Sequence, residues 1–276
     1  MIKLLRANIF RLKKDFTFFC TIIATIIVAL LLIATQLNNK FNYGEFVNID
    51  NILFLSPIII GILSAITTSL FIGLDYSDAT IRNKIIKGHK KADIYIANFL
   101  TSIIMNLIEI IIFMIIVSLF GLILLDGFAL SINEMICILI DIVFIACSYS
   151  AIFTFMAMFI NNATVSAIVN VFLIFIMLVV SFILLEKLAT PDTITQSVYN
   201  GNALVEEEIP NPNALTTKEK NTYQLIANLF PTGQALQVSQ IYKFDTNYEY
   251  YPLYSLVIIV AFTSLGIYLF ERKEIN

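Results

Sequence analysis

Charged residues are scarce in this chain. Asp, Glu, Lys and Arg make up 13% of its 276 residues, whereas hydrophobic residues make up 59%. Soluble domains carry about twice that share of charge. The composition excludes a disordered chain, a collagen-like repeat and a disulfide-rich secreted scaffold, and it argues strongly against a soluble enzyme. With a mean hydropathy of +0.87, the chain is expected to be an all-α membrane protein with several spans.

Residues that build catalytic and metal sites are also scarce. His89 is the only histidine, which excludes an HExxH motif and any metal site with several histidines in this chain. An aspartic protease needs two carboxylates, but Asp141 is the only aspartate deep in an apolar stretch. No glycine belongs to a GxxxxGK[ST] phosphate loop. We therefore expect no enzyme and no cofactor in this chain. The cysteines lie in apolar stretches without CxxC spacing and are interpreted as packing residues: Cys20, Cys137 and Cys147.

Six apolar stretches are long enough for membrane helices. A bilayer core of about 30 Å needs about 20 apolar residues in a helix. These runs are continuous, which is typical of helical spans, whereas barrel strands alternate polar and apolar residues. The first run is longer than the apolar region of a signal peptide and five more follow, so we interpret it as an uncleaved span. The chain is expected to form one transmembrane domain, 1–276, with the spans Phe16–Leu37, Ile52–Leu74, Ile94–Leu125, Met135–Ile160, Ala163–Leu185 and Leu253–Phe270.

The basic residues predict the orientation of these spans. Twelve of the 17 Lys and Arg residues fall in residues 1–15, in the loop 75–93 and in the C-terminal tail. Positive charge collects on the cytoplasmic side of membrane proteins. Both termini and the loop 75–93 are therefore expected in the cytoplasm, and the long segment 186–252 outside. The remaining basic residues lie on the predicted outer side: Lys40, Lys187, Lys218, Lys220 and Lys243.

The first 15 residues have the pattern of an amphipathic helix. Apolar residues recur with spacings of three and four, which places them on one helical face. Basic residues flank this face, as in helices that lie in the membrane interface. The alternative is that the basic residues only set the topology. The apolar face consists of Ile2, Leu5, Ile9, Leu12 and Phe16.

The loop 75–93 predicts a second short amphipathic helix. Asp78 is a candidate for its first residue and Gly88 for its end. Ile81 and Ile85 are four residues apart and would share one face. Such a helix could act as a lever for a soluble partner, and the alternative is a solvated basic loop that obeys the charge rule. The basic side chains that project elsewhere are those of Arg82 and Lys84.

This loop resembles that of ABC transporter permeases of the type-2 exporter class, which are related in architecture to ABCG transporters. Their pattern is an acidic residue and tyrosine, Gly-Thr, Arg-x-Lys, a hydrophobic pair, a glycine, basic residues and an aromatic. Ala79 stands where the family commonly has glycine, and Asn98 where a lysine often follows the aromatic. The rest of the architecture is also similar, from the interfacial helix to the long segment before the sixth span. The matching residues are Asp75-Tyr76, Thr80, Arg82-x-Lys84, Ile85-Ile86, Gly88, Lys90-Lys91 and Tyr95.

The resemblance implies a permease subunit in the bacterial cytoplasmic membrane that exports a hydrophobic or amphipathic substrate, such as an antimicrobial peptide or a drug. ATP and Mg would be bound by a separate ATPase dimer, and a second permease subunit, identical or different, would complete the transporter. No nucleic acid is expected as a partner. The alternative is a stand-alone membrane immunity or binding protein without an ATPase. The residues implied to couple to the ATPase are Asp78, Thr80, Ile81, Arg82, Lys84, Ile85 and Gly88.

The segment 186–252 is expected to hold short helices that dip back toward the membrane, as the resemblance implies. Thr216-x-x-Glu219 can form a capping box that begins one of them. Pro231 would stop this helix, and a second one could cover Gly233–Tyr242. The apolar side of the first helix would consist of Leu225, Leu229 and Phe230.

Two carboxylates lie inside the predicted spans. Glu109 is near the middle of the third span and Asp141 is about two turns inside the fourth. Ionised carboxylates are costly there, so both are expected to face the protein interior. They could line a polar substrate path or a proton-linked site, or they could simply form hydrogen bonds with Asn106 or Asn170.

The predicted topology can be tested with single cysteines at Ser77 and Ser197, in a chain that lacks the native cysteines. We expect an impermeant maleimide to label position 197 in intact cells and to label position 77 only after the membrane is opened. Labelling of position 77 but not of position 197 in intact cells would show that the topology is the reverse of the predicted one.

Overall fold

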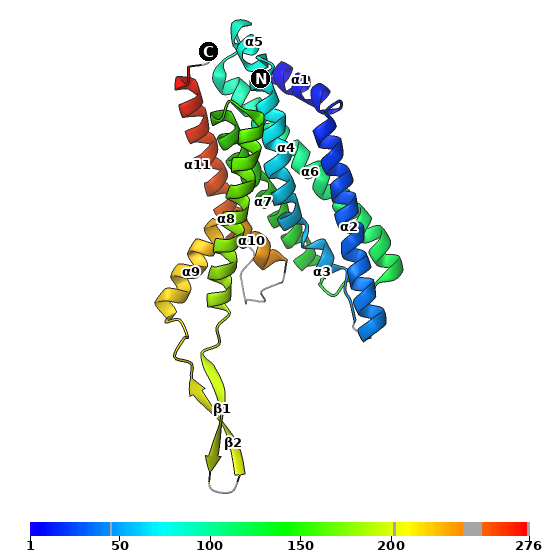
Figure 1. Ribbon diagram of the computed structural model, residues 1–276, viewed down its shortest axis with the longest axis vertical. Coiled ribbons are helices and arrows are strands. Elements are labelled where there is room, and N and C mark those ends of the chain that lie inside the picture. The colour runs from blue at the N-terminus through cyan, green and yellow to red at the C-terminus, as the bar shows by residue number, and fades with distance from the viewer. Residues whose placement is uncertain (45, 201–202, 240–249, 275–276) are drawn as a thin grey trace.

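The protein is an all-α membrane protein with six helices that are long and apolar enough to cross a bilayer. The computed structural model describes residues 1–44, 46–200, 203–239 and 250–274 (Figure 1). Each of the six predicted stretches forms a helix. The helices are α2 (Phe16–Tyr43), the pair α3 (Asp50–Leu53) and α4 (Ser56–Ser77), α6 (Lys91–Leu124), α7 (Ile132–Phe159), α8 (Ala163–Leu188) and α11 (Tyr251–Arg272).

Helices α4 and α7 form the centre of the bundle. In the most apolar stretch of each, 61% of the residues are buried, against 22–28% in the other four spans. Helix α4 packs against α2, α6, α7 and α8, and α7 packs against α11 as well. The outer helices expose apolar side chains such as Ile27, Ile115 and Phe172. A soluble protein would bury such residues, whereas a bilayer solvates them.

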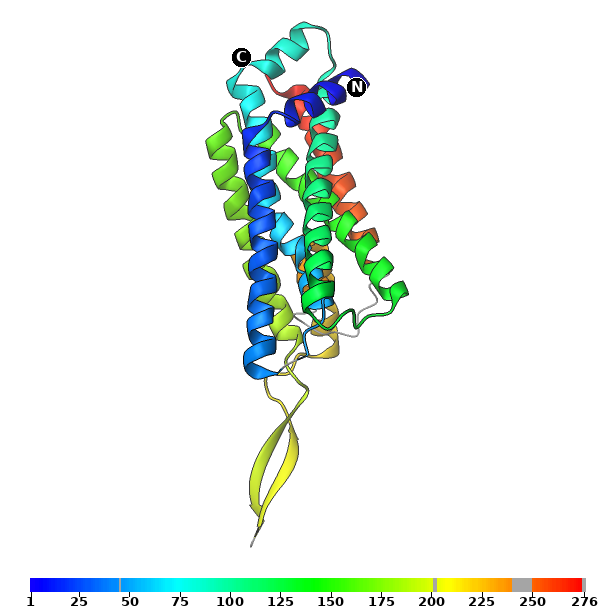
Figure 2. The same cartoon turned by 90° about the vertical axis from the view of Figure 1, so that its right-hand side faces the viewer.

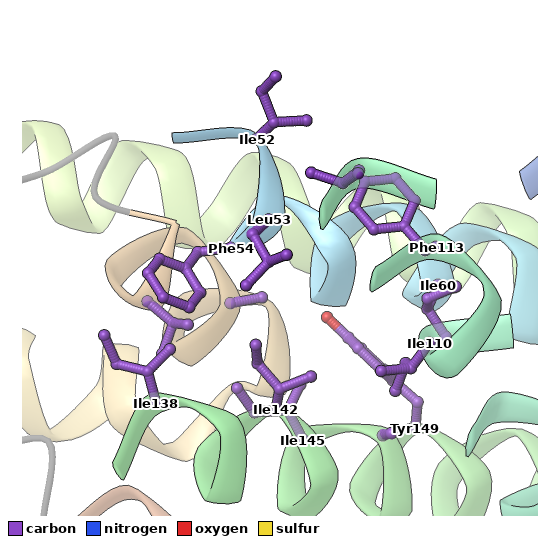
Figure 3. Close-up of a cluster of buried hydrophobic side chains, with 14 of the residues drawn as sticks. Ile52, Leu53, Phe54, Ile60, Ile110, Phe113, Ile138, Ile142, Ile145 and Tyr149 are labelled. Atoms are coloured by element: carbon purple, nitrogen blue, oxygen red, sulfur yellow. The ribbon is translucent and has the colours of Figure 1, made fainter. Parts of the chain in front are cut away.

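The largest apolar cluster lies where α3, α4, α6 and α7 meet (Figure 3). Each side chain labelled there is at most 4% exposed. Close packing at the other end of α4 depends on Gly73, because a Cβ added there would lie 2.3 Å from the Cα of Ala163 on α8. The labelled residues are Ile52, Leu53, Phe54, Ile60, Ile110, Phe113, Ile138, Ile142, Ile145 and Tyr149.

Two short helices lie across one end of the bundle, which we call the terminal end because Met1 and the end of α11 also lie there (Figures 1 and 2). They are α1 (Ile2–Leu12) and α5 (Thr80–Ile86). The predicted amphipathic α1 is confirmed, but its buried face is Leu4, Asn8 and Leu12. The apolar stripe predicted to face the membrane interface is divided, since Ile2 and Phe16 are 73% and 81% exposed whereas Leu12 is buried against the protein. The spacing of the apolar residues does not show which of them face the protein and which are exposed on its surface.

The predicted end of α5 is confirmed, but its predicted start is not. Gly88 ends the helix as predicted: its φ is +85°, and the His89 N–H donates to the Lys84 carbonyl at 3.2 Å, as in a Schellman motif. The predicted start at Asp78 is wrong, because the Asp78 N–H is still bonded to α4 and Ala79 precedes the helix with a φ of +52°. That left-handed conformation costs a non-glycine residue about 1–2 kcal/mol.

A β-hairpin projects from the opposite end, which we call the hairpin end (Figure 1). Its strands are β1 (Thr193–Asn200) and β2 (Ala203–Pro210), paired antiparallel with Thr193 opposite Pro210. The expectation of helices alone in this segment is therefore incomplete. The run Thr193-Ile194-Thr195 favours a strand because β-branched side chains fit an extended backbone.

The short helices predicted after the hairpin are present as α9 (Thr217–Leu229) and α10 (Pro231–Val238). The capping box is confirmed, since the Thr216 N–H donates to Glu219 Oε2 at 2.9 Å and Thr216 Oγ1 accepts from the Glu219 N–H. Pro231 separates the two helices, as expected. The predicted second helix is confirmed over residues 233–238, and its last residues, 240–242, lie outside the described ranges.

Replacing Gly73 with alanine should destabilise the protein by about 1–3 kcal/mol, because the added methyl group meets the backbone of α8 and forces the two helices apart. Thermal unfolding in detergent measures this change. Gly121→Ala is the matched control, since the nearest atoms to its methyl group would be side-chain atoms of Ile49 at 3.1 Å or more, and not backbone atoms. Equal losses in both variants would contradict a special role for the α4–α8 contact.

Candidate functional site

A single buried carboxylate organises the terminal end. Asp75, near the end of α4, has a fully buried side chain and accepts hydrogen bonds from two cations. Arg11 of α1 donates to its Oδ1, and Lys84 Nζ of α5 lies 2.9 Å from its Oδ2. Arg11 also donates to the Phe71 carbonyl at 2.8 Å and stacks on the Phe71 ring at 3.7 Å. Asp75 thus joins three helices.

Asn8 extends this cluster to α6. Its amide donates to Asn98 Oδ1 at 2.8 Å and to Thr101 Oγ1 at 3.3 Å, and its Oδ1 accepts from Lys84 Nζ at 3.3 Å. Asn8, Asn98 and Thr101 are at most 2% exposed. Asn98 is the position where the resembled family often has lysine. A lysine there would add a third cation beside Arg11 and Lys84, whereas asparagine accepts the Asn8 hydrogen bond.

Burial dominates the electrostatics of this cluster. Burial, and secondarily the charge of Arg11, lower the pKa of Lys84 to about 8. Burial also lowers the pKa of Arg11 to about 10, although the carboxylates of Asp15 and Asp78 act in the opposite direction. Asp75 pairs directly with both cations, and the carboxylates of Asp15 and Asp78 also act on Arg11.

A second set of contacts fixes the remaining helix ends. Lys273 Nζ donates to the carbonyls of Met158 and Phe159, both at 2.9 Å, and to Asn161 Oδ1 at 2.6 Å. Lys91 Nζ donates to the Lys273 carbonyl at 2.6 Å. Lysine side chains commonly satisfy carbonyl groups at helix C-termini. The ends of α6, α7 and α11 are therefore tied together beside the Asp75 cluster.

The predicted coupling residues divide between two faces of α5. Ile81 is 1% exposed and belongs to the same apolar cluster as Leu4 and Leu12 of α1. Lys84 and Ile85 also turn toward the chain, so this face holds α5 in place. Arg82 is exposed, and Ile86 is 72% exposed. The remaining predicted residues lie at the ends of α5: Asp78 and Gly88 are exposed, and Thr80 is partly buried.

Sequence reasoning missed Arg11, Asn8 and Ile86 as site residues and treated Asp75 only as part of a motif. A local signal existed for the first two, because residues 8 and 11 are three apart and share a face of α1. No local pattern links Arg11 to Asp75, which lie 64 residues apart in the chain.

The polar residues predicted inside the spans are all buried. Glu109 Oε1 accepts from Thr21 Oγ1 of α2 at 2.8 Å. Asn106 donates to Ser64 and Ser150, both at 2.8 Å, and Asn170 donates to Ser69 at 2.6 Å. The expectation that Glu109 or Asp141 bonds these asparagines is thus wrong, because serines of α4 and α7 occupy their amide groups. A role of these four residues in a translocation path stays a prediction.

Removing the Asp75 charge should cost more stability than removing an exposed one. Asp75→Asn leaves two partly buried cations without a counter-charge, and we expect a loss of about 2–4 kcal/mol. Asp192→Asn breaks the exposed Lys220–Asp192 pair and should cost no more than about 1 kcal/mol. Thermal unfolding of both variants in detergent gives the comparison. Similar small losses would show that Asp75 does not organise the terminal end.

Comparison with known proteins does not assign a family to the chain. No family model matches it, and no curated protein matches it. Its function is therefore inferred from the residues and contacts described above.

Proposed function

We propose that this chain is the membrane-spanning permease subunit of an ATP-driven ABC exporter of the type-2 class. In this proposal both termini lie in the cytoplasm of a bacterium. A separate ATPase dimer binds ATP and Mg, and a second permease subunit completes the path. The observation that carries the proposal is α5, a helix outside the spans that is anchored on one side and free on the other. Its free side presents Arg82 and Ile86 beyond the end of the bundle.

The contacts on the anchored side of α5 connect a displacement of this helix to the spans. Closure of the ATPases would displace α5, and the Lys84–Asp75 ion pair would pass this displacement to α4. Asn8, bonded to both Lys84 and Asn98, would pass it to α1 and α6. Because α4 is one of the two central helices, a shift at its end alters its contacts with α2, α6, α7 and α8. Alternating access would follow from such a rearrangement.

Buried acceptors inside the bundle suit a substrate with N–H groups. Among the described residues, Glu109 Oε2 and Asn106 Oδ1 lack hydrogen-bond partners, and the two residues lie one turn apart on α6. Unpaired acceptors in an apolar interior are costly. A helix rearrangement that opened this region would let an amphipathic peptide or drug supply the missing donors, which supports the substrate class proposed here.

Charge reversal on the free side of α5 should uncouple the permease from its ATPase. Arg82→Glu and Ile86→Asp leave the anchored side intact, so normal amounts should reach the membrane. We expect weaker co-purification with the partner ATPase, and lost transport, because an unfavourable charge at an interface can cost several kcal/mol. Lys218→Glu, an exposed residue of α9 toward the hairpin end, is the control.

Full transport in both α5 variants would mean that the loop only sets topology. A chain that never supports ATP turnover with an ATPase, yet protects cells against a peptide or drug, would instead favour the stand-alone immunity protein.

A further inference from the structure

A basic groove separates α1 from α5. Its volume is about 330 Å³, and its walls include Lys3 and Ala7 from α1, Asn83 and Lys84 from α5, and Lys87 directly after α5. None of the lining side chains is acidic. The polar groups at its surface are therefore mainly N–H donors, which suits an anion.

The groove lacks a counter-charge of its own. Asp75 already forms ion pairs with Arg11 and Lys84. Lys3 and Lys87 are exposed and form no ion pair with any residue in the described part of the chain. An anion in the groove would meet Lys3 and Lys87, whereas the ammonium group of Lys84 is already bonded to Asp75 and Asn8.

The position of the groove narrows the choice of anion. Helix α1 lies across the ends of the spans (Figure 2), which is the level of the lipid headgroups. Ile2 and Phe10 of α1 are 73% and 62% exposed, as expected for side chains that enter the bilayer surface. Leu4 and Ala7 add apolar lining beside the lysines. A ligand with a phosphate group and an attached apolar part fits both kinds of lining.

We propose that the groove between α1 and α5 binds the headgroup phosphate of an anionic phospholipid. Lys3 and Lys87 contact the phosphate from opposite walls, and Lys84 lies beside them. The bound lipid bridges the two helices beside the contacts of the Asp75 cluster. This site does not depend on the proposed transport function, because it needs neither an ATPase nor a substrate.

The chain has no tryptophan, so Phe10→Trp introduces a single fluorescent reporter on the lipid-facing side of α1. Phospholipids with brominated acyl chains quench tryptophan on contact. Quenching by brominated phosphatidylglycerol and by brominated phosphatidylcholine is compared in nanodiscs of unlabelled phosphatidylcholine. The ratio of the two apparent affinities measures the preference for the anionic headgroup, and quenching by the neutral lipid verifies that each variant remains folded.

We expect a clear preference for phosphatidylglycerol, and a loss of about fivefold in that preference for each of Lys3→Gln and Lys87→Gln, because each lysine near anionic lipid contributes about that factor. The matched control combines Lys13→Gln, at the end of α1, with Arg82→Gln, on the outer side of α5. Neither residue lines the groove. The control should keep most of the preference.

Equal losses in the control and in the groove variants would overturn the site and leave only diffuse surface attraction. Millimolar inorganic phosphate that abolished the preference would also overturn it, by showing that the groove holds a free anion. Failure of ATPase coupling would leave this result unaffected.

Discussion

The terminal end depends on one constraint: a buried carboxylate must be shared by two cations. Asp75 has no exposed surface, so the cost of removing its charge from water has to be offset by close partners. Arg11 and Lys84 come from α1 and α5, which otherwise contact the spans through few apolar residues. An ion pair of this kind contributes little net stability, but it allows few alternative arrangements. The positions of α1, α4 and α5 are consequently fixed relative to one another.

Within the spans, hydrogen bonds and small residues fix the positions of the helices relative to one another. Lipid tails are as apolar as the side chains, so burial alone does not hold membrane helices together. Asn106 and Asn170 reach serines on neighbouring helices, and Gly73 lets α4 approach the backbone of α8. Farther toward the hairpin end, Gln234 of α10 accepts from Ser255 of α11 at 2.7 Å. The helix contacts are thus specified by a few polar and small positions.

These features differ in how far sequence predicts them. The spans were predictable because a continuous apolar run has few stable alternatives in a bilayer, and the end of α5 was predictable because Gly88 adopts a conformation that other residues avoid. The face of α1 that packs on the protein was not predictable from the sequence, since this helix has both a protein neighbour and a lipid neighbour. The hairpin was missed because the strand signal at Thr193-Ile194-Thr195 is short and polar. The Asp75 cluster joins residues far apart in the chain, which no periodicity reveals.

Carboxylates also fix the hairpin end, and this limits how the protein can move. Asp50 Oδ2 accepts from the Ala129 and Leu130 N–H groups at 2.6 and 3.0 Å, and Asp126 accepts from the Val47 N–H at 2.9 Å. The connection before α3 is therefore bonded to the connection between α6 and α7. The other end of α6 is held by Asn8 through Asn98 and Thr101. In the proposed mechanism, a displacement at α5 would therefore shift whole helices against one another, as expected of closely packed elements with discrete arrangements.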